Sequence, residues 1–401
     1  MSLFLNVVQV SEAIAVVRTI AVPCGQELVP LHEALHRVLA ADVRADVDIP
    51  GFTRSVVDGF AVRAADTTGA GESVPAILTM LGRIVMGSSA DLSIRAGSCI
   101  YIPTGGILPE GADAAVMIEN TERAGDEVLV KRAVAHGENI LQYNEDFSKG
   151  DVVLSRGRRL SAQDIGVLAA AGCTDVPVTR LPRIGIISTG NELVPPGTRP
   201  GPGQVRDVNT SVVASAVRDL GCSPVPYGIV RDDRETLRKA IATAAGECDA
   251  VLISGGSSKD DRDMVAAIIA ENGEVLVHGI AIAPGKPTII GRYGSVPVIG
   301  LPGHPASAFI VLIAVVRHLI LCMTGDMGSS LRTVQATLSQ NVPSQRGRED
   351  YVRVAVSGGI AAPLFGKSGL LNTLVRSTGV IRIPAASEGL ETGTQVEVIL
   401  W

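Results

Sequence analysis

The sequence predicts a multidomain α/β protein built around a doubly wound, mostly parallel sheet at residues 181–325. In that segment, short continuous apolar runs alternate with patterns of helical spacing, as in a parallel sheet covered on both faces. The segment 45–140 instead has short apolar runs separated by glycine and proline, and the segment 326–401 has alternating apolar residues. Both patterns indicate β-rich domains. A chain of 401 residues is also too long for one ordinary core.

We expect the two remaining segments, 1–44 and 141–180, to form one discontinuous N-terminal linker domain around a β-rich insert domain at 45–140. Residues 9–41 are expected to be helical, because apolar residues recur at helical spacing at Val10, Ile14, Val17, Leu31, Leu35 and Val38. A second helix is expected at 161–171, where Ser161 and Asp164 have the spacing of a capping box.

The expected elements of the α/β domain follow one another regularly. Strands are predicted at 184–187, 225–230, 250–253 and 297–301, and helices at 209–220, 234–245, 261–270 and 305–323. The last helix contains the most apolar run of the chain, but Arg317 and His318 interrupt it. It is shorter than the roughly 20 residues that a membrane span requires, so a buried helix is expected. The alternation after residue 325 predicts a small C-terminal β-barrel domain at 326–401.

Composition excludes several classes of protein. The net charge is −6, and no run rich in lysine and arginine is present, so nucleic acid is not an expected partner. The six cysteines are scattered without a Cys-x-x-Cys pair, which favours reduced thiols in a cytosol over disulfides or a zinc site. The apolar start of the chain has no basic residue before Arg18, so it is a poor signal peptide. We therefore expect a cytoplasmic protein that does not enter a membrane.

Four polar or glycine-rich segments follow predicted strands of the α/β domain. Because ligands of doubly wound sheets bind beyond the carboxyl ends of the strands, these segments are expected to meet at one edge. Their backbone N–H groups and the helix N-termini behind them suit an anion. The segments are 188–192 (Ser-Thr-Gly-Asn-Glu), 231–233 (Arg-Asp-Asp), 254–258 (Ser-Gly-Gly-Ser-Ser) and 302–305 (Pro-Gly-His-Pro). The sequence thus predicts a phosphate-bearing small molecule as ligand.

Each polar side chain also has a structural interpretation when taken alone. Asp232, three residues before Glu235, fits a helix N-cap, and Asp263 fits the first turn of a helix. Lys286 fits a solvated surface lysine, although the flanking prolines make it a rigid contact for an anion. The chain has neither a Walker-type loop nor a Gly-x-Ser-x-Gly elbow. The functional interpretation of these side chains therefore depends on the four loops taken together.

The motifs together resemble a known family. Residues 55–61 read Ser-Val-Val-Asp-Gly-Phe-Ala, residues 103–106 read Pro-Thr-Gly-Gly, and 109–119 and 145–151 continue the series. Segments 188–192, 254–256 with Asp263, 284–287 and 300–307 then follow in the same order. In this order they are similar to the motifs of the MoeA-like molybdopterin molybdenumtransferases, over nearly the whole chain.

The resemblance implies a four-domain, elongated homodimer whose active site lies between the α/β domain of one subunit and the insert domain of the other. It implies that the enzyme inserts molybdate into the dithiolene of adenylylated molybdopterin, with Mg²⁺-dependent release of AMP. Several carboxylates facing a phosphate would repel it unless a divalent cation lay between them. Each pair of unit charges at about 4 Å is worth roughly 4 kcal/mol at an effective dielectric near 20.

The same resemblance implies roles for particular residues. Catalytic roles fall to Asp58, Thr104, Glu192, Asp232 and Asp263, of which Asp232 and Asp263 would hold the metal. Substrate-binding roles fall to Asp146, Ser254, Gly255, Gly256, Lys286, Pro302, Pro305, Ser307, Arg348, Arg353 and Ser368. One subunit would supply Asp58, Thr104 and Asp146. Either Arg348 or Arg353 would line the molybdate pocket with Ser368.

The chain departs from the family pattern at several positions. Val57 replaces a common Met and Asn144 a common Gly. Residues 257–260 read Ser-Ser-Lys-Asp, which adds Lys259 and Asp260, whereas Ala283 replaces a second lysine and His304 replaces an Asn. Tungstate in place of molybdate therefore stays open, because the two oxyanions share charge and shape.

Two other functions remain as alternatives. An adenylyltransferase that makes the adenylylated intermediate needs only the α/β domain, so the insert and C-terminal domains argue against it. A non-catalytic pterin-binding scaffold is disfavoured because Glu192, Asp232, Asp263 and Lys286 are present together. Formation of adenylylated pterin from ATP without molybdate would support the adenylyltransferase.

Overall fold

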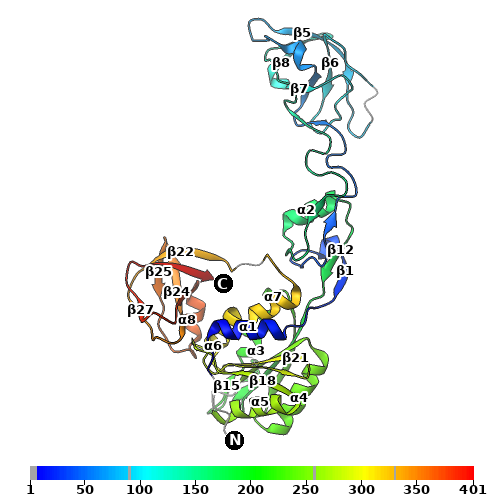
Figure 1. Ribbon diagram of the computed structural model, residues 1–401. Coiled ribbons are helices and arrows are strands. Elements are labelled where there is room, and N and C mark those ends of the chain that lie inside the picture. Colours follow the sequence, from blue (N-terminus) through cyan, green and yellow to red (C-terminus); the bar gives the residue numbers. More distant parts are fainter. Residues whose placement is uncertain (1–6, 89–91, 256–258, 329–330) are drawn as a thin grey trace.

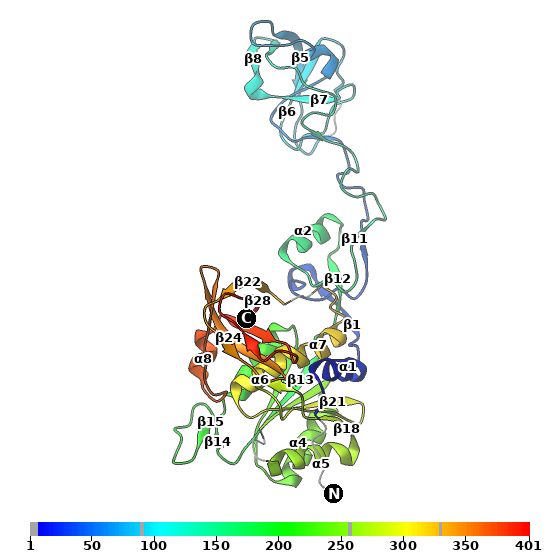
Figure 2. The same cartoon turned by 60° about the vertical axis from the view of Figure 1, so that its left-hand side comes forward.

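The computed structural model describes residues 7–88, 92–255, 259–328 and 331–401, without the side chains of 259–263. The protein is elongated (Figures 1 and 2). The β-rich insert domain lies at one end, the segment around α2 (Ala162–Ala170) lies in the middle, and the α/β and C-terminal domains lie together at the other end. This layout confirms the predicted fold class.

The α/β domain contains a six-stranded sheet in the order β16-β13-β17-β21-β20-β18. Its first four strands are parallel, and the last two are antiparallel additions. The two antiparallel strands were not predicted from the sequence. In the order of the sheet, the strands span Ser223–Val230, Arg183–Thr189, Ala250–Gly255, Val296–Leu301, Ile289–Tyr293 and Gly273–His278.

Helices cover both faces of this sheet, as the continuous apolar strands predict. Ile186 and Leu252 face one core with α3 (Asn209–Asp219), whereas Ile187 and Val251 face the other with α4 (Arg234–Glu247). Helix α5 (Lys259–Asn272) packs in the second core. Consecutive side chains of these strands therefore point into two different cores, one on each face of the sheet.

The predicted last helix is present as one continuous stretch, Pro305–Thr324. It consists of α6 (Pro305–Val311), a π-helical turn (Leu312–Val316) and α7 (Arg317–Thr324). It is long and apolar enough to cross a membrane, but 72% of its most apolar stretch is buried inside the protein. The helix ends at Gly325, whose φ of 67° is left-handed, a conformation that glycine adopts without a Cβ clash. The helix therefore forms part of the α/β core.

The predicted helix at 9–41 is correct only in its first part. Helix α1 (Val10–Ile20) is followed by β1 (Gln26–Pro30), which pairs antiparallel with β12 (Asp175–Thr179). A short 3₁₀ turn (Leu31–Glu33) follows. The helical spacing beyond Ile20 was misleading, because Pro23 and Gly25 interrupt the helix and cross-strand pairing decides the rest. The second predicted helix is confirmed as α2, with a capping box between Ser161 and Asp164.

The predicted domain boundaries stay a proposal, and the packing of α1 refines it. Val10, Ala13 and Val17 are buried in the same core as α3 and α7. The middle of the molecule instead has its own small core, which includes Leu39 and Leu168. In a division by packing, α1 would belong with the α/β domain rather than with the linker segments. Two short ladders complete the middle region: β2 (Val43–Arg44) with β11 (Val152–Leu154), and β3 (Arg54–Ser55) with β10 (Ile140–Leu141).

The insert contains a six-stranded sheet in the order β7-β4-β6-β5-β9-β8, as the short apolar runs predict. Its strands span, in chain order, Gly59–Val62, Ala76–Arg83, Ser98–Ile102, Ala114–Met117, Thr121–Ala124 and Glu127–Val130. Two cores lie against this sheet, one around Phe60 and one around Ile100. The insert therefore has the packing of a separate β domain.

The C-terminal domain is a closed five-stranded barrel, because β24 pairs with both β25 and β26 while β22 and β28 complete the ring. These strands span Thr333–Leu338 (β22), Glu349–Ser357 (β24), Ile360–Pro363 (β25), Gly379–Ile383 (β26) and Gln395–Leu400 (β28). Strand β19 (Ile282–Ala283) of the α/β region adds to β24 in parallel. Helix α8 (Leu371–Arg376) lies between the barrel and α6. Short ladders β14–β15 (Leu193–Val194, Val205–Arg206) and β23–β27 (Val342–Pro343, Gly389–Leu390) complete the chain.

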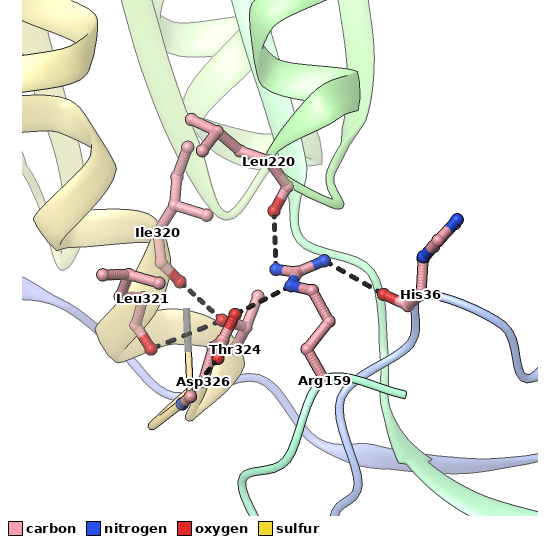
Figure 3. Close-up of polar contacts among 8 residues, drawn as sticks. His36, Arg159, Leu220, Ile320, Leu321, Thr324 and Asp326 are labelled. Carbon is pink, nitrogen blue, oxygen red and sulfur yellow. Dashed lines mark hydrogen bonds and ion pairs between the residues drawn. The ribbon is translucent and has the colours of Figure 1, made fainter. Parts of the chain in front are cut away.

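Arg159 joins three parts of the chain (Figure 3). Its guanidinium donates to the Asp326 carboxylate at 2.8 Å, to the His36 carbonyl at 3.0 Å and to the Leu220 carbonyl at 3.1 Å. These partners belong to the segment after α7, the linker region and the end of α3. Arg159 therefore fixes how the middle region meets the α/β domain.

Candidate functional site

Two cavities lie next to each other on the α/β domain. The first, which we name the sheet-edge cavity, measures about 670 Å³ and is lined by Glu192, Asp207, Ser254, Gly255 and Pro305 among others. The second, the interdomain cavity, measures about 530 Å³ and is lined by Lys286, Pro302, Ser307, Arg348 and Ser368 among others. Gly303 and His304 line both. Most of the site residues expected in the α/β and C-terminal domains thus gather around one shared wall.

The sheet-edge cavity lies at the carboxyl ends of parallel strands, as expected for a doubly wound sheet. Asp207, which is buried, accepts hydrogen bonds from the Ser188 hydroxyl at 3.0 Å and from the Thr210 hydroxyl and N–H at 2.6 and 3.1 Å. It therefore holds the first turn of α3 against the end of β13. The Asn209 amide donates to the Ser254 hydroxyl at 2.6 Å and to the Gly303 carbonyl at 2.7 Å. These contacts fix three loops around the cavity.

Gly255 is required by the close approach of two strands. A Cβ at this position would lie 2.1 Å from the Thr189 carbonyl oxygen, and its φ is +147°. Any other residue would push the loop after β17 away from β13. Gly255 therefore lets the two strand ends meet at the cavity.

Asp232 ties the loop after β13 to the end of β16. Its carboxylate accepts hydrogen bonds from the Thr189 hydroxyl and from the Asn191 N–H, the latter at 3.0 Å. The cap of α4 is instead Asp233, whose side chain accepts from the Thr236 N–H at 2.9 Å. The structural interpretation of Asp232 as a helix N-cap is therefore wrong. Asp232 is not among the described residues that line either cavity, but its hydrogen-bond partner Thr189 lines the sheet-edge cavity.

Lys286 is carried on a loop that is fixed at both sides. Strand β19 before it pairs with β24 of the barrel, and the Thr288 hydroxyl donates to the Gly285 carbonyl at 2.7 Å. Gly285 has a φ of +136°, and a Cβ there would lie 2.7 Å from Val311 Cγ2. The loop is therefore a rigid support for the lysine at the interdomain cavity.

The two candidate arginines occupy different environments. Arg348 lines the interdomain cavity and forms an ion pair of 2.9 Å with Asp350. Arg353 is only 7% exposed and donates to the Gly366 carbonyl at 2.7 Å. Burial lowers the pKa of Arg353. Its position supports the loop that carries Ser368, so of these two arginines Arg348 is the one that can meet a ligand in the cavity.

Asp58 and Thr104 lie together in the insert domain, where the Asp58 carboxylate accepts a hydrogen bond from the Thr104 N–H at 2.8 Å. Asp146 lies in the connecting stretch, and its N–H donates to the Ile49 carbonyl at 3.0 Å. Figure 1 places the insert at the opposite end of the molecule from the α/β and C-terminal domains, whose residues line the two cavities. Within one copy of the chain these residues therefore do not join the α/β site.

Part of the predicted site lies outside the described residues. Gly256 is one such residue, and for Asp263, Lys259 and Asp260 only the backbone of α5 is described. Within the described part of the chain, no group of three or more His, Cys, Asp or Glu side chains could hold a metal ion. The role of Asp263 as a metal ligand thus stays a prediction from the sequence.

Several residues of the site were not predicted. Asp207 and Asn209 had a readable signal, since they stand where a polar Asp-x-Asn precedes a helix of an α/β domain. His304 was placed in the predicted loop 302–305 and noted as a departure but given no role, although it lines both cavities. Arg346 also lines the interdomain cavity, but nothing in its sequence context distinguished it from a surface arginine.

This combination of a doubly wound sheet, a remote β insert and a barrel beside the ligand loops is that of a multidomain ligand-binding enzyme. Residues 8–172 match the MoeA N-terminal region (domain I and II), residues 185–321 the "Probable molybdopterin binding domain", and residues 335–401 the MoeA C-terminal region (domain IV). The chain belongs to the MoeA family.

Relatives and solved structures agree with this assignment. The chain is 36% identical to a "Putative molybdopterin biosynthesis protein" of Methanocaldococcus jannaschii, over 93% of this chain and 91% of that one. It is 32% identical to the molybdopterin molybdenumtransferase of Bacillus subtilis, over 93% and 89%. A crystal structure of a molybdopterin biosynthesis MoeA protein from Pyrococcus horikoshii superposes with a TM-score of 0.82 at 33% identity, covering 99% of this chain and 100% of the other.

Proposed function

We propose that this protein is a molybdopterin molybdenumtransferase of molybdenum cofactor biosynthesis. It would insert molybdate into the dithiolene of adenylylated molybdopterin and release AMP. Relatives that carry this enzyme name cover most of the chain. The observation that carries the proposal is the pair of adjacent cavities, because the reaction must bring an organic phosphate ester and an inorganic oxyanion to one point.

The chemistry of each cavity suits one of the two substrates. The sheet-edge cavity has the loops and the N-terminus of α3 that favour a phosphate-bearing ligand. The interdomain cavity has Lys286, Arg346 and Arg348 in its wall, and cationic side chains are suited to an oxyanion dianion. The ion pair of Arg346 with Glu388 joins side chains that are 70% and 72% exposed, so it is weak and leaves Arg346 able to turn to a ligand.

A Mg²⁺ ion fits the donor chemistry of the loop after β16. Asp232 is held by two hydrogen bonds from Thr189 and Asn191, and each carboxylate oxygen keeps a further acceptor position. Asp232, with Asp263 as the second ligand expected from the sequence, would hold the ion. When bound, Mg²⁺ would supply Lewis-acid stabilisation of the phosphoanhydride. The residues of this chain would hold the nucleotide and the oxyanion in place.

We propose that the working form is a cytoplasmic homodimer. Asp58 and Thr104 form a local pair in the insert, but the insert lies far from the α/β domain of its own chain (Figure 2), whose loops line the cavities. A second copy could place its Asp58, Thr104 and Asp146 at the cavities. Sedimentation of the purified protein would test the dimer, and mixing Asp58→Ala and Lys286→Ala subunits would test the shared site. Recovery of activity in the mixture is expected, because one of the two sites in a mixed dimer would be intact.

The decisive experiment is AMP release from adenylylated molybdopterin, titrated separately with molybdate and tungstate in the presence of Mg²⁺. We expect AMP release to depend on the oxyanion, and the two titrations would give the preferred oxyanion. Formation of adenylylated pterin from molybdopterin and ATP without oxyanion would instead establish an adenylyltransferase. Binding of the pterin without any turnover would establish a scaffold.

A further inference from the structure

His304 lies where the two cavities meet. It follows β21 in the loop that leads into α6, and with Gly303 it forms the described wall that the sheet-edge and interdomain cavities share. Gly303 has no side chain. A group that moves between ligands in the two cavities would therefore pass the imidazole of His304.

The imidazole is oriented by the C-terminal domain. Its Nδ1 lies 2.9 Å from the Ser368 hydroxyl, and the Ala306 N–H donates to the Ser368 carbonyl at 3.2 Å. The ring is therefore held by Ser368 through one nitrogen. The residue after Ser368 is Gly369, which has no side chain. Even a Cβ at this position would lie 3.8 Å from the His304 Nε2. The side chain of His304 is exposed, so Nε2 can reach a ligand.

We propose that His304 transfers protons at the junction of the two cavities. This inference rests on the proposed function. When a dithiol reacts with molybdate, two S–Mo bonds form, one Mo–O bond breaks, and the departing oxide takes two protons to leave as water. The two thiol protons balance those on the water, and the charge of −2 stays on the product. No oxidant or reductant is needed. His304 would accept a proton from a thiol through Nε2 and pass it to the departing oxygen.

The other charged groups around the junction are poorly suited to this transfer. Lys286, Arg346 and Arg348 face the interdomain cavity alone, where cationic side chains are suited to holding an oxyanion. Lys367 stands beside Ser368 in the barrel loop. Imidazole is the side chain that gives and takes protons near neutral pH.

Three more charged residues, Glu192, Arg206 and Asp207, line the sheet-edge cavity. Asp207 accepts three hydrogen bonds that hold α3, and Glu192 lines only that cavity. Neither carboxylate lines the wall that both ligands reach. The position of His304 thus distinguishes it from its charged neighbours.

The test compares His304→Asn with the wild-type full chain in the oxyanion-dependent reaction. The asparagine amide can still bond to Ser368 but cannot be protonated near neutral pH. We expect kcat to fall by roughly 100-fold or more, with the oxyanion concentration for half-maximal rate unchanged and the pH dependence of kcat flattened. Added imidazole should restore part of the rate of His304→Ala. His32→Asn is the matched control, because the His32 side chain is 80% exposed and His32 is not among the described residues that line either cavity.

The outcomes separate the inference from the function on which it rests. A wild-type rate and pH profile in His304→Asn would overturn the proton transfer while leaving the transferase intact. A raised oxyanion requirement at unchanged kcat would also overturn it, since His304 would then only bind the oxyanion. If the wild-type protein itself gave no oxyanion-dependent product, the proposed function would fail and the inference with it. Melting curves of the variants would show that each is folded.

Discussion

The guanidinium of Arg159 and the carboxylate of Asp326 form an ion pair of 2.8 Å, although the two residues are 167 positions apart in the chain. The Asp326 side chain is fully buried, whereas that of Arg159 is 22% exposed. The pair closes the joint between the middle region and the α/β domain (Figure 3). This joint sets the direction in which the insert domain extends.

Arg159→Ala is expected to destabilise this joint by about 3 kcal/mol. That is the lower end of the cost of breaking a buried ion pair, because Arg317 also interacts favourably with Asp326. Hydrogen exchange of α3 and of the segment around α2 would measure the loss locally. Arg238→Ala, which removes a solvent-exposed partner of Glu235, is the control and should change little. Equal protection in Arg159→Ala and wild type would show that the joint does not depend on this pair.

Lys286→Ala is expected to raise the oxyanion concentration for half-maximal rate by about 10- to 100-fold. The basis is the loss of one hydrogen bond to a charged group, worth about 1.5–3 kcal/mol. The measurement is a molybdate titration of AMP release at fixed pterin concentration. Lys239→Ala is the control, since that lysine lies on the exposed face of α4. An unchanged oxyanion requirement would rule out direct contact by Lys286.

Arg348 and Arg353 are expected to differ in what their loss affects. Arg348→Gln removes a cation from the interdomain cavity but keeps a donor for Asp350, so weaker tungstate binding with little loss of stability is expected. Arg353→Met removes the buried donor to the Gly366 carbonyl, so the free energy of unfolding should fall by about 1–3 kcal/mol. Calorimetric binding and urea unfolding would separate the two effects. Weaker oxyanion binding in the Arg353 variant alone would reverse the assignment.

We expect Asp249 to make the free energy of unfolding depend on pH. Burial raises the pKa of Asp249, but hydrogen bonds from the Arg180 side chain and the Arg183 N–H outweigh it and hold the pKa below its usual value. The carboxylate therefore contributes stability above the ordinary pKa of about 3.9 and loses it as the pH falls further. In urea unfolding, the difference between wild type and Asp249→Asn should be constant above about pH 5 and shrink below pH 4. Asp219→Asn, which removes an exposed carboxylate at the end of α3, serves as the control. A pH-independent difference between wild type and Asp249→Asn would contradict the linkage.

Asp263→Ala is expected to abolish oxyanion-dependent AMP release and leave the protein folded. The reason is its predicted role in holding Mg²⁺, with Asp232 as the other ligand. Turnover measured across a Mg²⁺ titration, alongside a melting curve, would check both parts. Wild-type turnover in the variant would remove Asp263 from the mechanism.

The sequence was informative wherever a local pattern also determined the packing. The apolar runs of β13 and β17 predicted buried parallel strands because each residue in them faces one of two helical layers. Helix α2 was readable through Ser161 and Asp164, which cap it locally. In contrast, the spacing of Leu31 and Leu35 predicted a helix through a region where β1 instead forms a strand. The partner strand β12 lies about 150 residues further along the chain, so no local pattern announces the pairing.

The loops that contribute residues to the candidate site could be predicted from the sequence, but the division of those residues between two cavities could not. Loops at strand ends identified Glu192 and Ser254 as neighbours, and the family resemblance added Lys286, yet the split into two cavities depends on contacts between distant segments. The hydrogen bond between His304 and Ser368 is one such contact, formed across 64 residues. Arg348 and Arg353 have the same residue type on nearby positions, and only their burial separates a ligand-facing side chain from a supporting one.

Strand β19 hydrogen-bonds to the barrel, although the chain around it belongs to the α/β region. Lys286 follows this strand by three residues, whereas Glu192 and Ser254 are carried by the central sheet. Lys286 thus stands between a strand that pairs with the barrel and β20, which belongs to the central sheet. A tilt of the C-terminal domain would therefore move one end of the Lys286 loop while the other end stayed fixed in the sheet, and so would change the shape of the interdomain cavity.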